Sequence, residues 1–200
     1  MTPFLASTLS TVELLSALLA VAAQVGLALL LVSALVARAG VHGARRLLAA
    51  IRAAVGPQAI AIGWLAAALA VGGSLWFSEA QHFLPCKLCW YQRTMMYPLA
   101  IVLGGAALTR DLRAWRYALP LALVGGAISI YHYQLEWFPH QGGSCDPTNP
   151  CTIIWFRELG YLTLPALALT AFAVVAAMSL LARSYERNLI AADNEGHDHG

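Results

Sequence analysis

The sequence predicts an all-α membrane protein whose chain crosses the bilayer five times. Hydrophobic residues make up 60% of its 200 residues and charged residues only 11%, a composition far from that of a soluble domain. The hydrophobic residues gather in runs of about 20, the length at which a helix spans the hydrocarbon core. The net charge is +2, and the arginines lie between these runs, which indicates membrane topology and argues against nucleic-acid binding.

The first hydrophobic run extends over about Val12–Ala37 and is interrupted only by Glu13 and Gln24. A cleaved signal peptide would carry positive charge before a shorter run. Here no Lys or Arg precedes the run, whereas several arginines follow it within residues 38–52. Because positive charge favours the cytoplasmic side, residues 1–57 are predicted to form a retained N-terminal transmembrane helix and a basic cytoplasmic linker.

Four further runs lie at about residues 58–77, 90–108, 114–134 and 161–181. Arginines cluster between the 90–108 and 114–134 runs and again after the last run, so these segments are predicted to be cytoplasmic. The two remaining loops therefore lie on the outer side. Residues 184–200 are predicted to be a polar cytoplasmic tail, in which His197-Asp198-His199 is compatible with weak metal binding or with a solvated chain end.

All four cysteines lie in the two outer loops, as two pairs. Cys86 and Cys89 are separated by two residues at the start of a helix, where the helix N-terminus stabilises a thiolate. Cys145 and Cys151 lie in a loop rich in proline and glycine. Two dithiols on one side of a membrane can pass a disulfide between them, which predicts a thiol–disulfide oxidoreductase. Arg93 lies one turn after Cys89, where its cost near hydrocarbon indicates a function such as support of a thiolate or a reduced acceptor. The alternative is that its side chain only snorkels to the lipid headgroups.

The residues alone leave other interpretations of the cysteines open. Cys86 and Cys89 could form a structural disulfide or half of a zinc site, and the four thiolates together could bind zinc. Cys145 and Cys151 could form a disulfide that only staples the loop. Thiol oxidation also requires an electron acceptor, and the chain has no glycine-rich nucleotide fingerprint. A lipid-soluble acceptor such as a quinone, which would meet Cys89 and Arg93 at the membrane edge, is therefore expected.

Three more polar residues lie near the outer ends of the predicted helices. Glu79 could relay protons or pair with Arg93, or could be a solvated interfacial carboxylate. His132 faces outward in the last turn of a span, where a role near a quinone or in proton transfer competes with that of an ordinary interfacial histidine. Glu136 is expected to be a solvated helix end, and residues 152–159 a short amphipathic segment along the interface.

Five sequence stretches combine in a specific order over about residues 58–183. They are Leu75-Trp76-Phe77-Ser78-Glu79; Pro85-Cys86-Lys87-Leu88-Cys89-Trp90-Tyr91-Gln92-Arg93 with Met96-Tyr97-Pro98-Leu99; Ser129-Ile130-Tyr131-His132-Tyr133; Cys145-Asp146-Pro147 with Pro150-Cys151-Thr152; and Gly160-Tyr161-Leu162-Thr163-Leu164-Pro165. This combination resembles the DsbB-type disulfide-bond formation proteins, particularly their BdbC-like branch.

The resemblance implies a four-helix transmembrane bundle core with two outer cysteine loops over residues 58–183, to which the first run adds one extra N-terminal transmembrane helix. It implies a multi-pass protein of the inner or plasma membrane of a prokaryote, with both cysteine pairs on the extracytoplasmic side. The implied activity is that of a protein-dithiol:quinone oxidoreductase that supports disulfide formation in exported proteins. Its partner would be a thioredoxin-like disulfide donor similar to DsbA or BdbD, and its electron acceptor a membrane quinone, either ubiquinone or menaquinone.

The same resemblance implies a role for each cysteine. Cys86 and Cys89 would be the quinone-coupled pair, with Cys89 nearest the quinone and Arg93 supporting it. Cys145 and Cys151 would be the shuttle pair, and Cys145 would be the cysteine that the partner attacks.

The chain departs from the family pattern in several places. Ser78 and Glu136 stand where the better-known DsbB branch has glutamines, so quinone contacts of those glutamines are not expected here. The first hydrophobic run lies outside the family's core and has no implied role. A non-catalytic membrane protein with structural disulfides or a zinc site is the alternative function. A quinone reductase similar to vitamin K epoxide reductase is disfavoured, because the Cys-x-x-Cys pair comes first in the chain.

Overall fold

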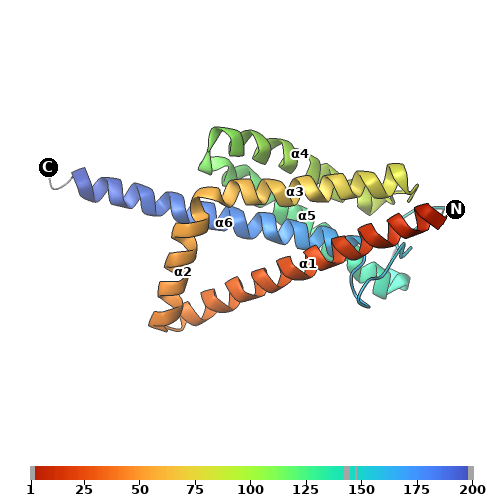
Figure 1. Ribbon diagram of the computed structural model, residues 1–200, viewed down its shortest axis with the longest axis horizontal. Helices are drawn as coiled ribbons and strands as arrows, with labels where there is room; N and C mark the ends of the chain where they lie inside the picture. The colour runs from red at the N-terminus through yellow and green to blue at the C-terminus, as the bar shows by residue number, and fades with distance from the viewer. Residues whose placement is uncertain (1–2, 142–144, 147, 198–200) are drawn as a thin grey trace.

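A computed structural model describes the backbone of residues 3–141, 145–146 and 148–197, and the side chains from residue 11 to residue 194 within these ranges. Four helices form the core: α3 (Ala59–Leu75), α4 (Lys87–Thr109), α5 (Trp115–Trp137) and α6 (Leu164–His197). Figure 1 shows them lying along a common axis. Both α3 and α5 pack against α4 and α6, which gives a four-helix bundle.

Short helical turns connect or extend these helices. They are η1 (Gly56–Gln58), η2 (Trp76–Ala80), η3 (Leu112–Ala114) and η4 (Pro139–Gln141). The η2 segment is a π-helical turn that continues α3 toward the first cysteine loop. Single π turns occur frequently at functional sites, and this one leads directly into the segment that carries Cys86.

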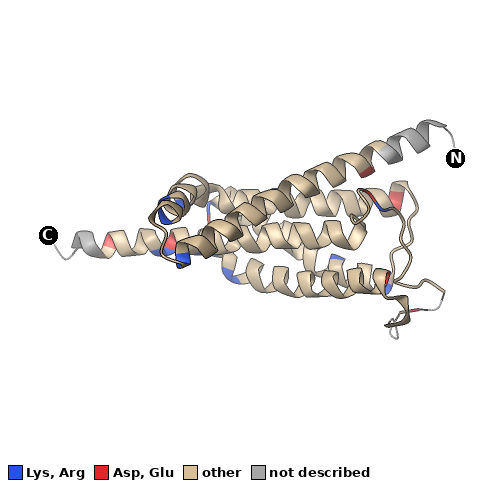
Figure 2. Cartoon of the chain, turned by 90° about the horizontal axis from the view of Figure 1, so that it is seen from below, with Lys and Arg blue, Asp and Glu red and all other residues tan. Residues whose placement is uncertain are grey.

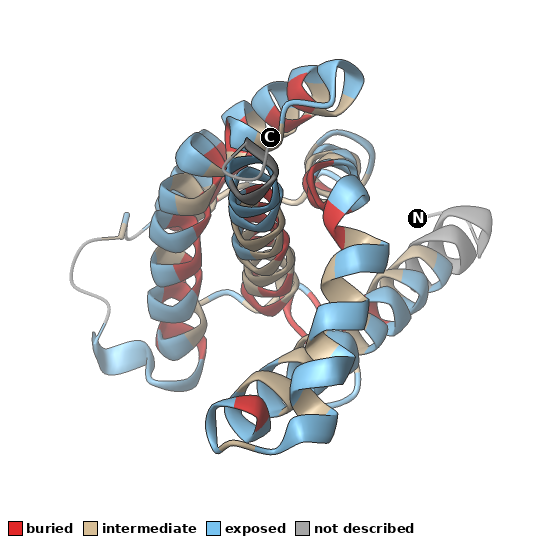
Figure 3. Ribbon diagram, turned by 90° about the vertical axis from the view of Figure 1, so that its left-hand side faces the viewer, coloured by how far each residue is buried: buried red, intermediate tan, exposed pale blue. Residues whose placement is uncertain are grey.

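Two helices lie outside the core. Helix α1 (Pro3–Arg38) runs obliquely along the bundle and contacts α6, and α2 (His42–Val55) crosses the bundle axis to connect α1 with α3 (Figure 1). Figure 3 shows that both helices are mostly exposed. Large hydrophobic side chains of α1 such as Leu15, Leu19 and Leu29 are 54%, 60% and 64% exposed, as expected for a helix that contacts lipid.

Helical segments that are long and apolar enough to cross a membrane are Thr11–Arg38, His42–Ala80 and Leu164–Asn194. Helices α4 and α5 have 23 residues each and lie beside α3 and α6. At a rise of about 1.5 Å per residue each is about 35 Å long, enough to span the hydrocarbon core. The prediction of an all-α membrane protein with a four-helix core and an additional N-terminal helix is therefore confirmed.

The buried residues lie on the facing sides of the core helices, as Figure 3 shows. Leu99 and Leu103 of α4 and Phe172 of α6 are almost fully buried there. Gly125 of α5 faces Phe172, and a Cβ atom at this position would overlap the phenylalanine ring. The glycine thus allows α5 to approach α6 closely, as small residues do between membrane helices.

The structure differs from the predicted runs in the linker and at the C-terminus. Most of the predicted linker forms α2, whose arginines Arg45 and Arg46 are exposed. Helix α6 continues through the polar segment to His197 because side chains anchor it there: Glu186 accepts a hydrogen bond from Trp115 Nε1 at 2.7 Å and pairs with Arg113 at 3.3 Å. The side chains of His197-Asp198-His199 lie outside the described residues, so a role for them stays a prediction.

The segment of residues 152–159 also differs from its expected form. It is not helical, and Phe156 within it is buried. Ring centroids of Phe83 and Trp155 lie 4.6 Å apart, and those of Phe77 and Phe156 lie 5.3 Å apart. Aromatic stacking therefore packs this segment against Phe77 and Phe83, beside the first cysteine loop, and its position along the membrane interface stays a prediction.

Charged residues are distributed unevenly along the bundle axis. Figure 2 shows most Lys and Arg residues toward the end where α2 and the α4–α5 turn lie. The two cysteine loops lie together at the opposite end. Both cysteine pairs thus share one end of the bundle, away from most of the positive charge.

Candidate active site

The first cysteine pair lies at the start of α4, where Cys86 is the N-cap residue. The Cys86 sulfur accepts a hydrogen bond from the backbone N–H of Cys89 at 3.3 Å, which satisfies one of the free N–H groups of the first helical turn. Both cysteines are free thiols whose sulfur atoms lie 2.8 Å apart. Cys86 is buried and Cys89 is partly buried, so the pair faces inward from the end of the helix.

His132 of α5 connects this pair to the second cysteine loop. Its Nε2 lies 3.6 Å from the Cys86 sulfur and 3.1 Å from the carbonyl oxygen of Cys151. The side-chain nitrogen of Gln92 lies 3.3 Å from His132 Nδ1. Because the carbonyl can only accept and the amide nitrogen can only donate, these contacts fit the neutral tautomer with its proton on Nε2. His132 then directs an N–H toward the Cys86 sulfur.

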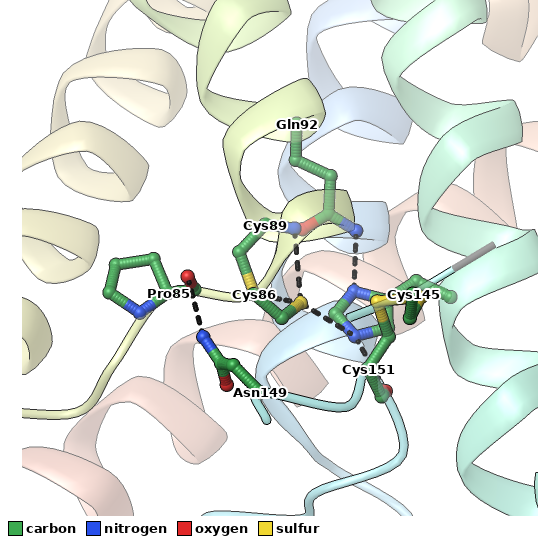
Figure 4. The surroundings of a disulfide bond; sticks show 8 residues. Pro85, Cys86, Cys89, Gln92, Cys145, Asn149 and Cys151 are labelled. Atoms are coloured by element: carbon green, nitrogen blue, oxygen red, sulfur yellow. Dashed lines mark hydrogen bonds between the residues drawn. A yellow bond between two sulfur atoms is a disulfide. The ribbon is translucent and has the colours of Figure 1, made fainter. Parts of the chain in front are cut away.

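The second pair, Cys145 and Cys151, forms a disulfide in the loop between α5 and α6. Cys151 is buried and contributes to a small apolar cluster that also contains Cys86, whereas Cys145 is only partly buried. Asn149 Nδ2 donates a hydrogen bond to the carbonyl oxygen of Pro85 at 3.1 Å. Figure 4 shows the consequence: the loop disulfide lies beside Cys86, on the other side of that residue from Cys89.

A cavity of about 630 Å³ lies between α1, α3, α4 and α6. Its lining is mainly apolar and follows α3 and η2 from Ile62 to Phe77, a distance of about 22 Å along a helix. Cys89, Gln92 and Arg93 also line the cavity. The first cysteine pair therefore has two faces: Cys86 faces His132 and the loop, and Cys89 faces the long cavity.

Arg93 is held on the wall of this cavity by α3. Its Nε donates to Ser74 Oγ at 3.0 Å and its Nη2 donates to the carbonyl oxygen of Ser74 at 2.9 Å. The guanidinium also lies 5.2 Å from the centroid of the Trp90 ring. The side chain is buried, and no carboxylate among the described residues lies within ion-pair distance of it. A positive charge with no ion-pair partner in the described part of the chain therefore lines the cavity next to Cys89.

A second, much smaller cavity separates the two cysteine pairs. Its volume of about 10 Å³ is at the lower limit for holding one water molecule, and Cys86, His132, Glu136 and Cys151 are among the residues that line it. Glu136 is buried and accepts a hydrogen bond from Thr163 Oγ1 at 2.6 Å. The prediction that Glu136 is a solvated helix end is therefore wrong, because the N-terminal end of α6 covers it.

The hydrogen bond from the Cys89 thiol lowers the pKa of the Cys86 thiol to about 4. Burial opposes this shift, and the hydrogen bond and charge interaction with His132 add to it. Cys86 is thus the thiolate of the reduced pair at neutral pH, and the thiolate is the nucleophilic form of cysteine.

The ligand atoms of Cys86, Cys89 and His132 also lie within 4.8 Å of one another, which is compatible with metal binding. A tetrahedral zinc site would need a fourth ligand in addition to these three.

The remaining residue predictions have mixed outcomes. Glu79 is exposed and accepts a hydrogen bond from Ser78 Oγ at 3.1 Å. Sequence reasoning did not single out Gln92 and Ser74, which orient His132 and Arg93. Gln92 lies one turn after Cys89, and this spacing could have predicted that it shares a helix face with the cysteine. Nothing in the sequence connects Ser74 with a residue of another helix.

Comparison with known proteins gives a consistent result. Residues 56–182 match the family described as disulfide bond formation protein DsbB. The chain is 44% identical over 114 residues to the disulfide bond formation protein C of Bacillus subtilis (strain 168), an alignment that covers 56% of this chain and 83% of that protein.

Two further relatives are named probable disulfide formation proteins. The one from Oceanobacillus iheyensis is 38% identical over 124 residues, covering 59% of this chain and 83% of its own. The one from Coxiella burnetii (strain CbuK_Q154) is 39% identical over 122 residues, covering 60% of this chain and 83% of its own. No solved structure matches the chain significantly. Since the family match covers more than half of the chain, this multi-pass membrane protein belongs to the DsbB family of disulfide bond formation proteins.

Proposed function

We propose that the protein is a protein-dithiol:quinone oxidoreductase that reoxidises a thioredoxin-like extracytoplasmic disulfide donor and passes the electrons to a membrane quinone. One observation carries this proposal: the Cys86–Cys89 pair lies between a loop disulfide and a long apolar cavity with a positive charge on its wall. An apolar cavity about 22 Å long suits a ring that bears an isoprenoid tail better than it suits a small soluble acceptor.

The reaction takes three balanced steps. A partner dithiol reduces the Cys145–Cys151 disulfide and is itself oxidised to a disulfide. The resulting loop dithiol then reduces the Cys86–Cys89 disulfide and reforms its own. Finally, Cys86 and Cys89 are oxidised to a disulfide while quinone takes up two electrons and two protons to give quinol. The structure contains a loop disulfide and two free thiols at Cys86 and Cys89, which corresponds to the state before the third step.

The protein's own side chains support each transfer. His132 directs an N–H at the Cys86 sulfur, so it stabilises the thiolate that leaves or attacks during exchange between the pairs. Arg93, fixed by Ser74, would stabilise negative charge that develops on an acceptor beside Cys89. The small cavity between the pairs has room for one water, which would connect Glu136 and His132 for proton transfer.

The charge distribution supports an orientation. Arginines follow the first run and flank the α4–α5 turn, so this end of the bundle is proposed to face the cytoplasm. The two cysteine loops, at the opposite end, would then face the extracytoplasmic side, where disulfides persist and exported proteins fold.

A second candidate function follows from the cluster of Cys86, Cys89 and His132. Their ligand atoms are close enough to hold a metal ion, so a non-catalytic zinc site is the competing hypothesis. Stoichiometric zinc in the purified protein that blocks alkylation of Cys86 would favour it. The long cavity beside Cys89 has no role in that hypothesis, and this is why we prefer the oxidoreductase.

Quinone reduction by the purified protein, with a reduced thioredoxin-like partner, tests the proposal. We expect turnover in the wild type and none in Cys89→Ser, because the pair can no longer form a disulfide. Arg93→Ala should lower the rate about tenfold to a hundredfold, which corresponds to the loss of a charged hydrogen-bonding group worth about 1.5–3 kcal/mol. Thr94→Ala, a change at the exposed neighbouring position, serves as the matched control and should leave the rate unchanged.

The Cys145→Ser variant separates the two half-reactions. It should lose oxidation of the partner, yet its Cys86–Cys89 pair, reduced directly with dithiothreitol, should still reduce quinone. Wild-type turnover in Cys89→Ser, or no turnover of wild type with any quinone, would contradict the proposal.

A further inference from the structure

Helix α1 forms one wall of the large cavity. Val12, Ser16, Leu19, Ala20 and Ala23 line the cavity, and their spacing of three or four residues places them on a single face of the helix. This helix lies outside residues 56–182, the part of the chain that matches the family. The wall is therefore an addition of this chain to the family's core.

Polar contacts fasten this part of α1 to the core. Gln24 Nε2 donates a hydrogen bond to Thr170 Oγ1 of α6 at 2.9 Å, and the Tyr161 hydroxyl donates to Gln24 Oε1 at 2.7 Å. Ala17 is fully buried and packs with Leu162. Both the nitrogen and the oxygen of the Gln24 amide are thus hydrogen-bonded. In a lipid-exposed helix, these bonds fix the position of α1 against α6.

The part of α1 that lines the cavity between Leu19 and Ala23 is apolar, and two of its three lining side chains are small. Ala20 and Ala23 have small side chains, so the space beside them belongs to the cavity. Leu19 lines the cavity although it is 60% exposed, which places it at the rim, where the cavity opens toward lipid. The α1 wall contains no arginine, cysteine or histidine, and the groups suited to a quinone ring lie on α4.

We infer that α1 contacts the isoprenoid tail of the acceptor, and that the small side chain of Ala23 determines how tightly this protein holds long-tailed quinones. The inference rests on the proposed quinone reaction and extends it to a helix outside the family match. The geometry of the cavity supports it. The quinone ring would lie toward Cys89 and Arg93, and its tail would run between α1 and α3 to the rim at Leu19. An ordinary lipid acyl chain is the other occupant that such a groove would accept.

The test compares Ala23→Phe with Ala22→Phe in the full-length protein. Ala23 lines the cavity, whereas Ala22 is exposed on another face of α1, so the two variants add the same ring to the same helix. Binding is measured by quenching of tryptophan fluorescence, because Trp76 and Trp155 line the cavity. Two quinones with the same ring are used, one with a long isoprenoid tail and one with no tail, and quinone reduction is measured in parallel.

We expect Ala23→Phe to weaken binding of the long-tailed quinone by about fivefold or more and to raise its KM similarly, since the ring overfills the space of the tail. Binding of the tail-less quinone and the KM for the partner dithiol should not change. Ala22→Phe should resemble wild type throughout. Ala23→Val, a smaller change less able to displace α1, should act in the same direction with a smaller effect.

Three outcomes would overturn the inference. Wild-type binding of the long-tailed quinone by Ala23→Phe, alongside normal turnover, would show that α1 does not touch the tail and that lipid fills the groove, while the proposed reaction would stand. Equal weakening of both quinones would place the effect at the ring. A wild-type protein that neither binds nor reduces any quinone would overturn the proposed reaction and the inference together.

Discussion

The two cysteine pairs lie at the same end of the bundle, but different kinds of structure hold them. Cys86 and Cys89 belong to the first turn of a core helix, and their positions follow from α4. Cys145 and Cys151 belong to a loop that reaches the core through Asn149 and through aromatic stacking. The helix pair is thereby fixed relative to the cavity, and the loop pair has one partly exposed cysteine, Cys145.

His132 lies between these two kinds of structure. It contacts Cys86 of the helix pair and the carbonyl oxygen of Cys151 in the loop pair. Under the proposed function, this arrangement would separate an exchange reaction with a soluble protein at the loop pair from an oxidation reaction in the membrane at the helix pair. We therefore expect that changes around the helix pair alter the pKa and reactivity of Cys86, whereas changes in the loop's attachment alter the rate of disulfide transfer between the pairs.

The largest expected effect concerns the acidity of Cys86. Its pKa of about 4 means that the thiolate is present above this pH and is lost as the pH falls through it. Alkylation of Cys86 in the reduced protein, quantified by mass spectrometry, should therefore be constant from about pH 8 to about pH 5 and should halve near pH 4. A cysteine with an ordinary pKa of about 8.5 would lose reactivity about tenfold per pH unit over this range, and this result at Cys86 would contradict the assignment.

The His132→Ala variant refines the same measurement. Loss of the imidazole should raise the pKa of Cys86, and the hydrogen bond from Cys89, the larger cause of its acidity, should still keep it below the ordinary value. The midpoint of alkylation should thus move upward by part of the full difference. Gln134→Ala, an exposed change on the same helix, should leave the midpoint in place.

A smaller effect is expected where the loop attaches to the helix pair. Asn149→Ala removes the hydrogen bond to the Pro85 carbonyl oxygen, so the loop disulfide should be held less closely beside Cys86. A lost hydrogen bond of about 1 kcal/mol predicts a roughly fivefold slower disulfide transfer between the pairs, measured by rapid quenching and alkylation. His140→Ala, an exposed change in the same connection between α5 and α6, is the control, and an equal slowing there would show that Asn149 has no special role.

Much of the fold was predictable because local patterns determine it. Hydrophobic runs of membrane-spanning length predict the helices, and arginines between them predict which loops share a side. The spacing of Cys86, Cys89 and Arg93 within one helix likewise places Cys89 and Arg93 on the wall of the same cavity.

The remaining features depend on contacts between distant segments. Glu136 reads as a helix end, but it is buried, and it accepts a hydrogen bond from the hydroxyl of Thr163, which lies 27 residues later. The continuation of α6 beyond its apolar part depends on Glu186 contacting Trp115 and Arg113. The α1 wall of the cavity depends in the same way on Gln24, whose polar side chain reads in the sequence only as an interruption of a hydrophobic run.

The order in which the two pairs become reduced tests the central claim most directly. Fully oxidised wild-type protein is mixed with one equivalent of a reduced thioredoxin-like partner in the absence of quinone, quenched at intervals, and alkylated to quantify thiols at each cysteine. Thiols at Cys145 and Cys151 should appear first and then decline, while thiols at Cys86 and Cys89 accumulate and disappear only when quinone is added. Reduction of Cys86 and Cys89 before the loop pair, or loop thiols that accumulate beside an intact Cys86–Cys89 disulfide, would contradict transfer in series.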